Sequence, residues 1–289
     1  MSKDIFARDL GFPEAPLLLP DGSLLLVEMS TDKGWIIHVS ADGKDRRVVA
    51  RTGRPNGLAR DRSGAIWVAE TAHRALLKMS LNGSFETFAD NANGEPFVFL
   101  NDLAFAPNGE LFLTDSGILH DDIVPGGELV PNYRDLNFDG RVYRIDTQTR
   151  HVEIVDRGFK FTNGIAFGPD GALYIAETLT GNIYRYRSRN SRIVGERELF
   201  GNVIEHFDPA VLQGPDGMKF GADGNLYVCV FGQGDVTVLD RDGHVVRRIK
   251  VQGTLPTNLA FKDEKIYVTE VTTGTVQVFD VGTRGLPLN

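Results

Sequence analysis

The chain has 289 residues, and its 31 lysine and arginine residues against 39 aspartate and glutamate residues give a net charge of −8 at pH 7. This balance argues against nucleic acid as a partner, because nucleic-acid-binding surfaces need clustered basic side chains. The sequence has no apolar run of the roughly 18 residues that span a membrane, and its single cysteine, Cys229, excludes an intramolecular disulfide. We therefore expect a cytoplasmic, globular protein with no membrane partner.

One unit recurs six times along the chain: an apolar run, a turn, and a second apolar run. The copies begin at Glu14, Asn56, Asn101, Asn163, Asp216 and Thr257. Glycine makes up roughly 11% of the residues against an ordinary ~7%, and five glycines occupy the turns: Gly22, Gly64, Gly109, Gly171 and Gly224. In the sixth copy Asp263 and Glu264 replace the turn glycine. Each copy predicts a β-hairpin whose turn needs a positive φ.

Further strand-like runs follow each hairpin, at 35–40, 75–80, 141–146, 182–187, 236–240 and 276–280. Many of these runs lead into a fourth, so each unit predicts four short strands and a spacing of about 40–60 residues. This pattern is typical of an all-β, six-bladed β-propeller, with residues 1–289 as one domain. The last unit lacks a fourth strand, and we expect residues 4–10 to supply it and to close the ring.

The longest connection, residues 116–140, separates two strands of the third unit. Long loops inside compact domains are usually functional, so we predict a lid over one channel mouth, with Ile118, His120 and Tyr133 as wall residues. Within and just after it, one set of residues has the spacing of a calcium-binding loop: Asp135, Asn137, Asp139, Gly140 and Asp146. Because flanking helices are missing and residues 141–146 have the pattern of a strand, a plain turn is favoured over a second calcium site.

The six opening residues take equivalent positions in the first strand of each unit, and we expect them to form a ring at one mouth of the channel. Unpaired buried carboxylates are costly, so Glu14 and Asp216 directed at one axis indicate a bound cation or a shared proton. Carboxylate and amide oxygens suit Ca²⁺, Mg²⁺ or Mn²⁺ better than Zn²⁺. The alternative is that the Asn-Gly and Asp-Gly pairs are turns only, although Glu14 has no such turn preference.

Four segments carry a resemblance to a known family: FPEAP at 12–16, LND at 100–102, TNG at 162–164 and GPDGM at 214–218. With them, nearly the whole chain resembles the SMP-30/gluconolactonase/luciferin-regenerating-enzyme family. The resemblance implies a six-bladed propeller with one divalent cation, held by Glu14, Asn163 and Asp216. It also implies that Asn101 binds substrate, or ligates the metal as in related phosphotriesterase-like propellers.

One position departs from this resemblance. Sugar-lactonase relatives carry an arginine two positions before the asparagine that matches Asn101, and Phe99 stands there in this chain. A guanidinium offers a fork of hydrogen-bond donors, whereas a phenyl ring offers none. We therefore expect a lactone or ester that is less polar than a sugar lactone.

The reaction that these residues favour is hydrolytic opening of a lactone by a metal-dependent enzyme. A cation can polarise the carbonyl and lower the pKa of a bound water; Asp216 is the expected base, while Asn101 and Asn56 orient the substrate or stabilise the oxyanion. Phe99 and His120 are expected to contact the substrate. Calcium is the expected ion, with Zn²⁺, Mn²⁺ or Mg²⁺ as alternatives. A related metal-dependent propeller enzyme, such as a phosphotriester hydrolase or isomerase, and a non-enzymatic binding propeller remain alternatives, and the oligomeric state is left open.

Overall fold

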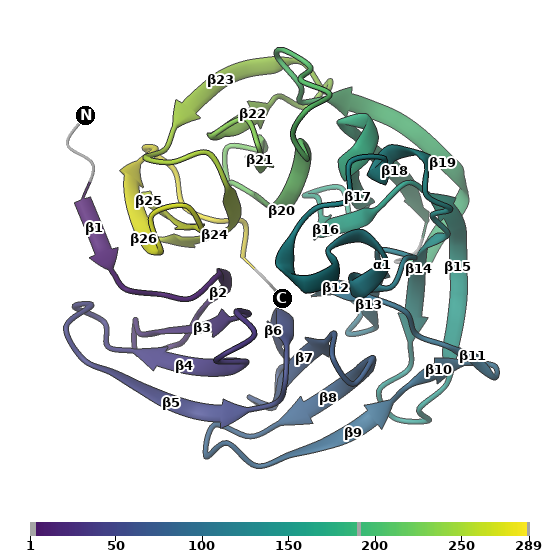
Figure 1. Ribbon diagram of the computed structural model, residues 1–289, viewed down its shortest axis with the longest axis horizontal. Helices are drawn as coiled ribbons and strands as arrows, with labels where there is room; N and C mark the ends of the chain where they lie inside the picture. The colour runs from purple at the N-terminus through teal and green to yellow at the C-terminus, as the bar shows by residue number, and fades with distance from the viewer. Residues whose placement is uncertain (1–3, 190–191, 288–289) are drawn as a thin grey trace.

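Six four-stranded antiparallel sheets surround a central axis in the computed structural model, which describes residues 4–189 and 192–287 (Figure 1). The first strand of each blade contacts the first strands of the neighbouring blades, so these six strands are the innermost. They are β2 (Pro13–Leu18), β6 (Pro55–Arg60), β12 (Leu100–Phe105), β16 (Thr162–Phe167), β20 (Gly214–Phe220) and β24 (Pro256–Lys262). The predicted all-β, six-bladed propeller is confirmed.

The second strands of the blades are β3 (Leu24–Glu28), β7 (Ile66–Glu70), β13 (Leu111–Asp115), β17 (Leu173–Glu177), β21 (Leu226–Phe231) and β25 (Lys265–Glu270). The third strands are β4 (Trp35–Val39), β8 (Ala75–Met79), β14 (Gly140–Ile145), β18 (Asn182–Arg189), β22 (Asp235–Leu239) and β26 (Thr275–Asp280). The outer strands are β5 (Arg46–Arg51), β9 (Phe85–Ala89), β15 (Val152–Phe159), β19 (Arg192–Asn202), β23 (Val245–Lys250) and β1 (Asp4–Ala7). A small hairpin of β10 (Asn91–Ala92) and β11 (Glu95–Pro96) precedes β12.

The core lies between the blades, where apolar side chains of adjacent sheets form buried clusters. Between the second and third blades, the Trp67 ring lies 4.7 Å from the Phe88 ring and 6.2 Å from the Phe105 ring, both edge-on. Cys229 is fully buried in the cluster between the fifth and sixth blades. Each turn glycine has a positive φ, such as 81° at Gly22, and Asp263 takes the equivalent conformation with φ 55°.

The ring is closed by a strand from the opposite end of the chain, as expected. Strand β1 pairs antiparallel with β26, with Asp4 opposite Val278. The Phe6 ring lies 5.0 Å from the Tyr267 ring, and Ala7 is buried. This pairing covers the edge that β26 would otherwise expose.

Deleting residues 1–8 is expected to lower the free energy of unfolding by about 3–5 kcal/mol, because Phe6 and its neighbours lose their burial and β26 becomes a free edge. Thermal or urea unfolding measures the change. The substitution Arg8→Ala, at an exposed position next to the strand, is the control and should cost less than about 0.5 kcal/mol. Wild-type stability of the shortened chain would contradict this role for β1.

Residues 116–140, the segment predicted to be a lid and named the lid below, follow the end of β13 (Figure 1). The end of β13 pairs with the beginning of the inner strand β12, with Leu100 opposite Asp115. The lid contains the short helix α1 (His120–Ile123) and two 3₁₀ turns, Pro125–Gly127 and Tyr133–Asp135. Its apolar side chains pack with Phe99 and Phe161, which precede β12 and β16. In the described part of the chain, no helix is long and apolar enough to cross a membrane.

Candidate metal and substrate site in the channel

Each inner strand leaves its regular pairing with the second strand at the same point. The register shifts just after Glu14, Pro55, Leu100, Thr162, Pro215 and Pro256. In five strands two residues lie at this irregularity, and such irregularities redirect side chains. They are Asn56–Gly57, Asn101–Asp102, Asn163–Gly164, Asp216–Gly217 and Thr257–Asn258. In β2 the irregularity comes one residue later, because Glu14 still pairs with Val27, and Glu14–Ala15 is the equivalent pair by alignment of the copies.

Glycine at the second place of three pairs lets neighbouring inner strands approach each other closely. A Cβ atom at Gly164 would collide with the carbonyl oxygen of Asp216, and one at Gly217 would collide with the side chain of Asn258. The strands that carry the polar residues are therefore held together by backbone contact.

Glu14 and Asp216 are buried carboxyl groups that lie close enough to affect each other's ionisation. Burial and the charge of Asp102 raise the pKa of Glu14 to about 8, although Asn258 Nδ2 donates to Glu14 Oε2 at 3.1 Å. Burial raises the pKa of Asp216 well above its ordinary value, and the charges of Glu14 and Asp102 raise it further. The site thus disfavours its own negative charge unless a cation is present.

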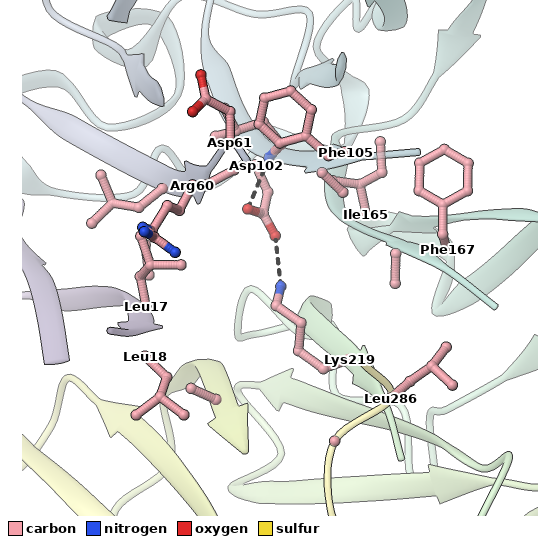
Figure 2. A pocket seen from close by; sticks show the side chains of 18 of the residues that line it. Leu17, Leu18, Arg60, Asp61, Asp102, Phe105, Ile165, Phe167, Lys219 and Leu286 are labelled. Atoms are coloured by element: carbon pink, nitrogen blue, oxygen red, sulfur yellow. Dashed lines mark hydrogen bonds and ion pairs between the residues drawn. The ribbon is translucent and has the colours of Figure 1, made fainter. Parts of the chain in front are cut away.

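Lys219 is a cationic side chain that lies next to Asp102 and lowers the pKa of Glu14 by its charge. Its Nζ lies 3.7 Å from Asp102 Oδ2, an atom with no hydrogen-bond partner among the described residues (Figure 2). Three carboxylates, Glu14, Asp102 and Asp216, and one ammonium group leave two negative charges. One divalent cation would balance them.

Asn163 supplies a neutral ligand atom in the same ring. Its Nδ2 donates to Thr178 Oγ1 at 3.1 Å. Its Oδ1 is buried and accepts no hydrogen bond from any residue that the structure describes. The side chain of Asn163 also hydrogen-bonds with Asp216. An unpartnered buried amide oxygen in the same ring as two carboxylates is of the ligand type that Ca²⁺, Mg²⁺ and Mn²⁺ prefer, so the chemistry of Glu14, Asn163 and Asp216 fits a divalent cation.

The structure places the other two predicted asparagines at equivalent positions of the ring. Asn101 Nδ2 donates to Ser116 Oγ at 3.1 Å, and Asn56 Nδ2 donates to the Leu100 carbonyl oxygen at 3.4 Å. Each amide group keeps a second N–H group and an oxygen atom that these two hydrogen bonds do not use. Orientation of a substrate and stabilisation of an oxyanion by Asn101 and Asn56 therefore both stay predictions.

The sixth position differs from the expectation. Thr257 Oγ1 donates to the Pro13 carbonyl oxygen at 2.8 Å and lies 2.8 Å from Thr269 Oγ1, so this side chain belongs to the wall. Asn258, the next residue, reaches Glu14 instead. Thr257 therefore bonds to the channel wall, as Asn56 does, and its neighbour Asn258 makes the contact with Glu14. Asp102 is the second residue of its pair, as Asn258 is. The other four copies have glycine or alanine there, so a polar side chain at this position was the sequence signal that both residues differ from the rest.

Apolar side chains form the wall above the ring, on the lid side. The Phe99 ring lies 5.8 Å from the Phe161 ring and 5.8 Å from the His120 ring. Ile118 is buried in the same cluster, and its role as a wall residue stays a prediction. Burial lowers the pKa of His120 below its ordinary value, and Arg54 Nη1 lies 3.2 Å from His120 Nδ1. Nothing in the sequence indicated that Arg54 belongs to this site, because 66 residues separate it from His120.

Tyr133 joins the lid to the loop of residues 203–213 by a hydrogen bond. Its hydroxyl donates to the Val211 carbonyl oxygen at 2.8 Å, and its ring is buried in the lid. Residues 203–213 lead into β20, which carries Asp216. The contact therefore joins the lid to the strand that bears the expected base.

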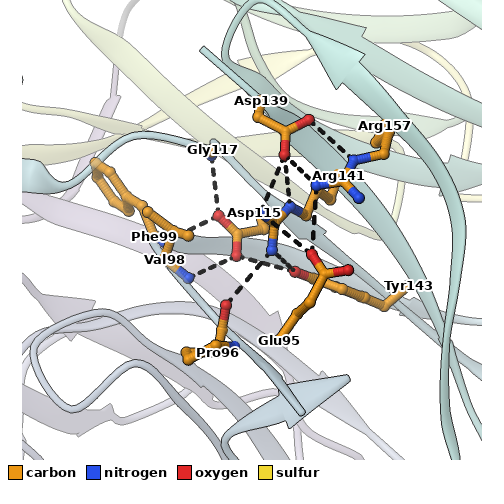
Figure 3. Close-up of polar contacts among 10 residues, drawn as sticks. All are labelled: Glu95, Pro96, Val98, Phe99, Asp115, Gly117, Asp139, Arg141, Tyr143 and Arg157. Carbon is orange, nitrogen blue, oxygen red and sulfur yellow. Dashed lines mark hydrogen bonds and ion pairs between the residues drawn. The ribbon is translucent and has the colours of Figure 1, made fainter. Parts of the chain in front are cut away.

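Asp115 holds the backbone on both sides of the site (Figure 3). It accepts hydrogen bonds from the backbone N–H groups of Val98 at 2.8 Å, Phe99 at 2.9 Å and Gly117 at 2.9 Å. It thus fixes the loop that carries Phe99 and the beginning of the lid. In the described chain, four other second strands also end on an acid that accepts backbone N–H groups of the loop before the inner strand: Glu28, Glu70, Glu177 and Glu270.

A cavity of about 800 Å³ opens at the opposite end of the channel. Its walls include Leu17, Phe105 and Phe167 (Figure 2). The polar residues Asp102, Lys219 and Asn258 also line it. Leu286, near the end of the chain, also lines it. The polar ring thus lies between this cavity and the lid.

The second calcium loop does not form. Asp139 precedes β14 and Asp146 follows it, so the two carboxylates stand at opposite ends of a six-residue strand, roughly 20 Å long. Asp139 Oδ2 pairs with Arg141 Nη2 at 3.0 Å and with Arg157 (Figure 3). Asp146 accepts backbone N–H groups of the following turn, as the plain-turn interpretation predicted.

Without a divalent cation, the protein is expected to lose stability as the pH rises from about 5.5 to about 8. A carboxyl group whose pKa is raised on folding, such as that of Glu14 to about 8, holds its proton more tightly in the folded chain. The protonated carboxyl group therefore stabilises the folded chain fully below the pKa that the group has in the unfolded chain. This stabilisation is lost as the pH rises toward the pKa in the folded chain, by up to roughly 1.4 kcal/mol for each pH unit and each group. Thermal unfolding in EDTA measures this slope. The double variant Glu14→Gln, Asp216→Asn should flatten it, and an unchanged slope would contradict the assignment.

Comparisons with known proteins show the family of this chain. The family model described as SMP-30/gluconolactonase/LRE-like region matches residues 12–275. The chain is 27% identical over 248 residues to a gluconolactonase of Zymomonas mobilis, a match that covers 79% of this chain and 67% of that protein. It is 26% identical over 207 residues to the protein strictosidine synthase-like 4 of Arabidopsis thaliana, covering 69% of this chain and 52% of that protein, and so spans about half the length of that relative.

A solved structure supports the fold. Regucalcin, a calcium-binding protein from Agrobacterium tumefaciens, matches with a TM-score of 0.80 and 18% identity, over 99% of this chain and 95% of that chain. The family model covers most of the six blades described above, including the segments that carry Glu14, Asn163 and Asp216. The chain therefore belongs to the SMP-30/gluconolactonase/LRE-like family.

Proposed function

We propose that this protein is a divalent-cation-dependent hydrolase that opens a lactone less polar than a sugar lactone. The observation that carries the proposal is the buried oxygen ring of Glu14, Asn163 and Asp216, with an unpartnered Asn163 Oδ1, beneath a wall of aromatic side chains. The gluconolactonase relative supports the reaction class, and Phe99 in the wall supports the less polar substrate.

The proposed chemistry is addition of water to the lactone carbonyl carbon, cleavage of the ring C–O bond, and transfer of a proton to the leaving oxygen. A divalent cation held by Glu14, Asn163 and Asp216 supplies polarisation of the carbonyl and a more acidic water. With the cation bound, Asp216 would be ionised and would take up the proton at a carboxylate oxygen. The leaving oxygen then receives that proton, so the carboxylate is regenerated.

The remaining residues orient the substrate and exclude water. Asn101, held through Nδ2 by Ser116, offers its amide oxygen to a substrate hydroxyl group or to the cation. Phe99 and Phe161 contact the apolar part of the lactone, and the lid shields the ring from bulk water. His120 and Arg54 lie at the polar edge of this wall.

The test is a lactone panel with defined metals. Protein stripped with EDTA is expected to lose at least about 100-fold in kcat/KM and to recover it with Ca²⁺ or Mn²⁺. A tightly held metal without lactonase activity would favour a related metal-dependent reaction, such as phosphotriester hydrolysis or isomerisation. A protein that binds no divalent cation would favour a non-enzymatic binding propeller.

A further inference from the structure

Thr178 lies between two residues of the proposed cation site. Its Oγ1 is 2.9 Å from the carbonyl oxygen of Pro215, the residue before Asp216, and 3.1 Å from Asn163 Nδ2. A carbonyl oxygen carries no proton, so the hydroxyl must donate to Pro215 and accept from Asn163. The single hydroxyl proton of Thr178 is therefore used in the hydrogen bond to Pro215 and cannot be donated to Asn163.

The neighbouring blade repeats this arrangement. Ser116 Oγ donates to the Thr162 carbonyl oxygen at 2.9 Å and accepts from Asn101 Nδ2 at 3.1 Å. Thr162 directly precedes Asn163. Each hydroxyl thus joins the asparagine of its own blade to the peptide group that precedes the next polar ring residue.

Because each hydroxyl proton is donated to a backbone carbonyl oxygen, the hydroxyl oxygen can only accept a hydrogen bond from the asparagine, and this determines the orientation of the amide group. The oxygen and nitrogen branches of an asparagine side chain have nearly the same shape, so packing alone selects neither. If Asn163 Oδ1 faced Thr178 Oγ1, two acceptors would meet with no proton between them. Oδ1 must therefore take the other branch, and there it is buried without a partner among the described residues.

We propose that Thr178, and in the same way Ser116, are positioning residues that direct the amide oxygens of Asn163 and Asn101 toward the cation. The inference rests on the cation site of the proposed function and concerns how that site is built, not which reaction it performs.

Thr71 is a matched control within the same chain. Its Oγ1 donates to the Leu100 carbonyl oxygen at 3.0 Å, which is the same link between neighbouring blades. Asn56 donates directly to that carbonyl oxygen rather than to the hydroxyl. Loss of the Thr71 hydroxyl therefore removes an equivalent hydrogen bond and leaves the amide of Asn56 in place.

The experiment measures the dissociation constant for Ca²⁺ and for Mn²⁺ by titration calorimetry on metal-stripped full-length protein. Thr178→Val is expected to weaken binding by about 10–100-fold, the range found for groups that orient metal ligands. Thr178→Ser, which keeps the hydroxyl, and Thr71→Val should stay within about 3-fold of the wild type. Thermal unfolding without metal verifies that the two valine variants lose similar stability.

A double-mutant cycle separates orientation of the amide from general disruption. A carboxylate presents an oxygen whichever way it faces, so the loss caused by Thr178→Val should shrink to less than about 3-fold in an Asn163→Asp background. Wild-type affinity in Thr178→Val, an equal loss in Thr71→Val, or an undiminished loss in the Asn163→Asp background would each overturn the proposal.

The outcomes also separate this proposal from the proposed function. If the wild type binds cations but hydrolyses no lactone, the proposed function fails while the affinity series still decides the role of Thr178. A wild-type protein that binds no divalent cation would overturn both.

Discussion

Replacing Asp216 by asparagine is expected to weaken binding of a divalent cation by at least about 1000-fold and to abolish lactone hydrolysis. The three carboxylates and Lys219 leave two negative charges at the ring, and the substitution removes one of them from a buried, poorly solvated position. It also removes the proposed base. Calorimetric titration with Ca²⁺ and initial rates on a lactone panel measure the two losses.

The same variant should be more stable than the wild type when no cation is present. A buried carboxylate without a counter-charge destabilises the folded chain, and burial raises the pKa of Asp216 for that reason. We expect the melting temperature in EDTA at about pH 8 to rise by roughly 2–4 °C for each kcal/mol gained. The control is Asp45→Asn, an exposed aspartate of the first blade, which should change neither quantity. Wild-type cation affinity in Asp216→Asn would refute the assigned ligand.

Among lactones of one ring size, kcat/KM is expected to rise by about 3- to 4-fold for each methylene added to an alkyl substituent, until the wall is filled. The reason is the apolar surface of Phe99, Phe161 and Ile118 above the ring. A sugar lactone, whose hydroxyl groups find few donors in this wall, should react about 100-fold more slowly than an alkyl lactone of similar size. Initial rates across a homologous series measure the slope.

A pair of phenylalanine variants shows which end of the channel receives the substrate. Phe99→Ala should flatten the chain-length dependence, because the side chain lies on the lid side. Phe167→Ala changes a residue that lines the cavity at the opposite end and should leave the dependence unchanged. The reverse result would mean that the substrate enters through that cavity.

The six hairpins could be predicted from the sequence because each depends on neighbouring residues only. A turn glycine such as Gly22 and the apolar runs on either side are local signals. The strand that closes the ring could be inferred because the last unit was one strand short. In the same way, alignment of the copies was sufficient to bring Glu14, Asn163 and Asp216 to one level.

Positions that depend on register could not be predicted in this way. Thr257 aligned with the ring residues, yet the irregularity in β24 turns Asn258 toward Glu14 instead. Lys219 follows Asp216 by three residues and gave no sign that it would face Asp102 from another blade. An acidic residue at the end of the second strand recurs in most copies of the unit, and Asp115 is the one that ends β13. Its role could not be predicted, because it depends on the path of the loop whose backbone it binds.

The pairing of β1 with β26 also has a consequence for the order of events during synthesis. Strand β1 is made first and has no partner until β26 has been translated, more than 260 residues later, since Asp4 lies opposite Val278. Blades whose four strands are consecutive can form on the ribosome as they emerge, whereas the sixth must wait for the far end of the chain. The most non-local contact is therefore the last to form, and the newly made chain carries a free strand edge until then.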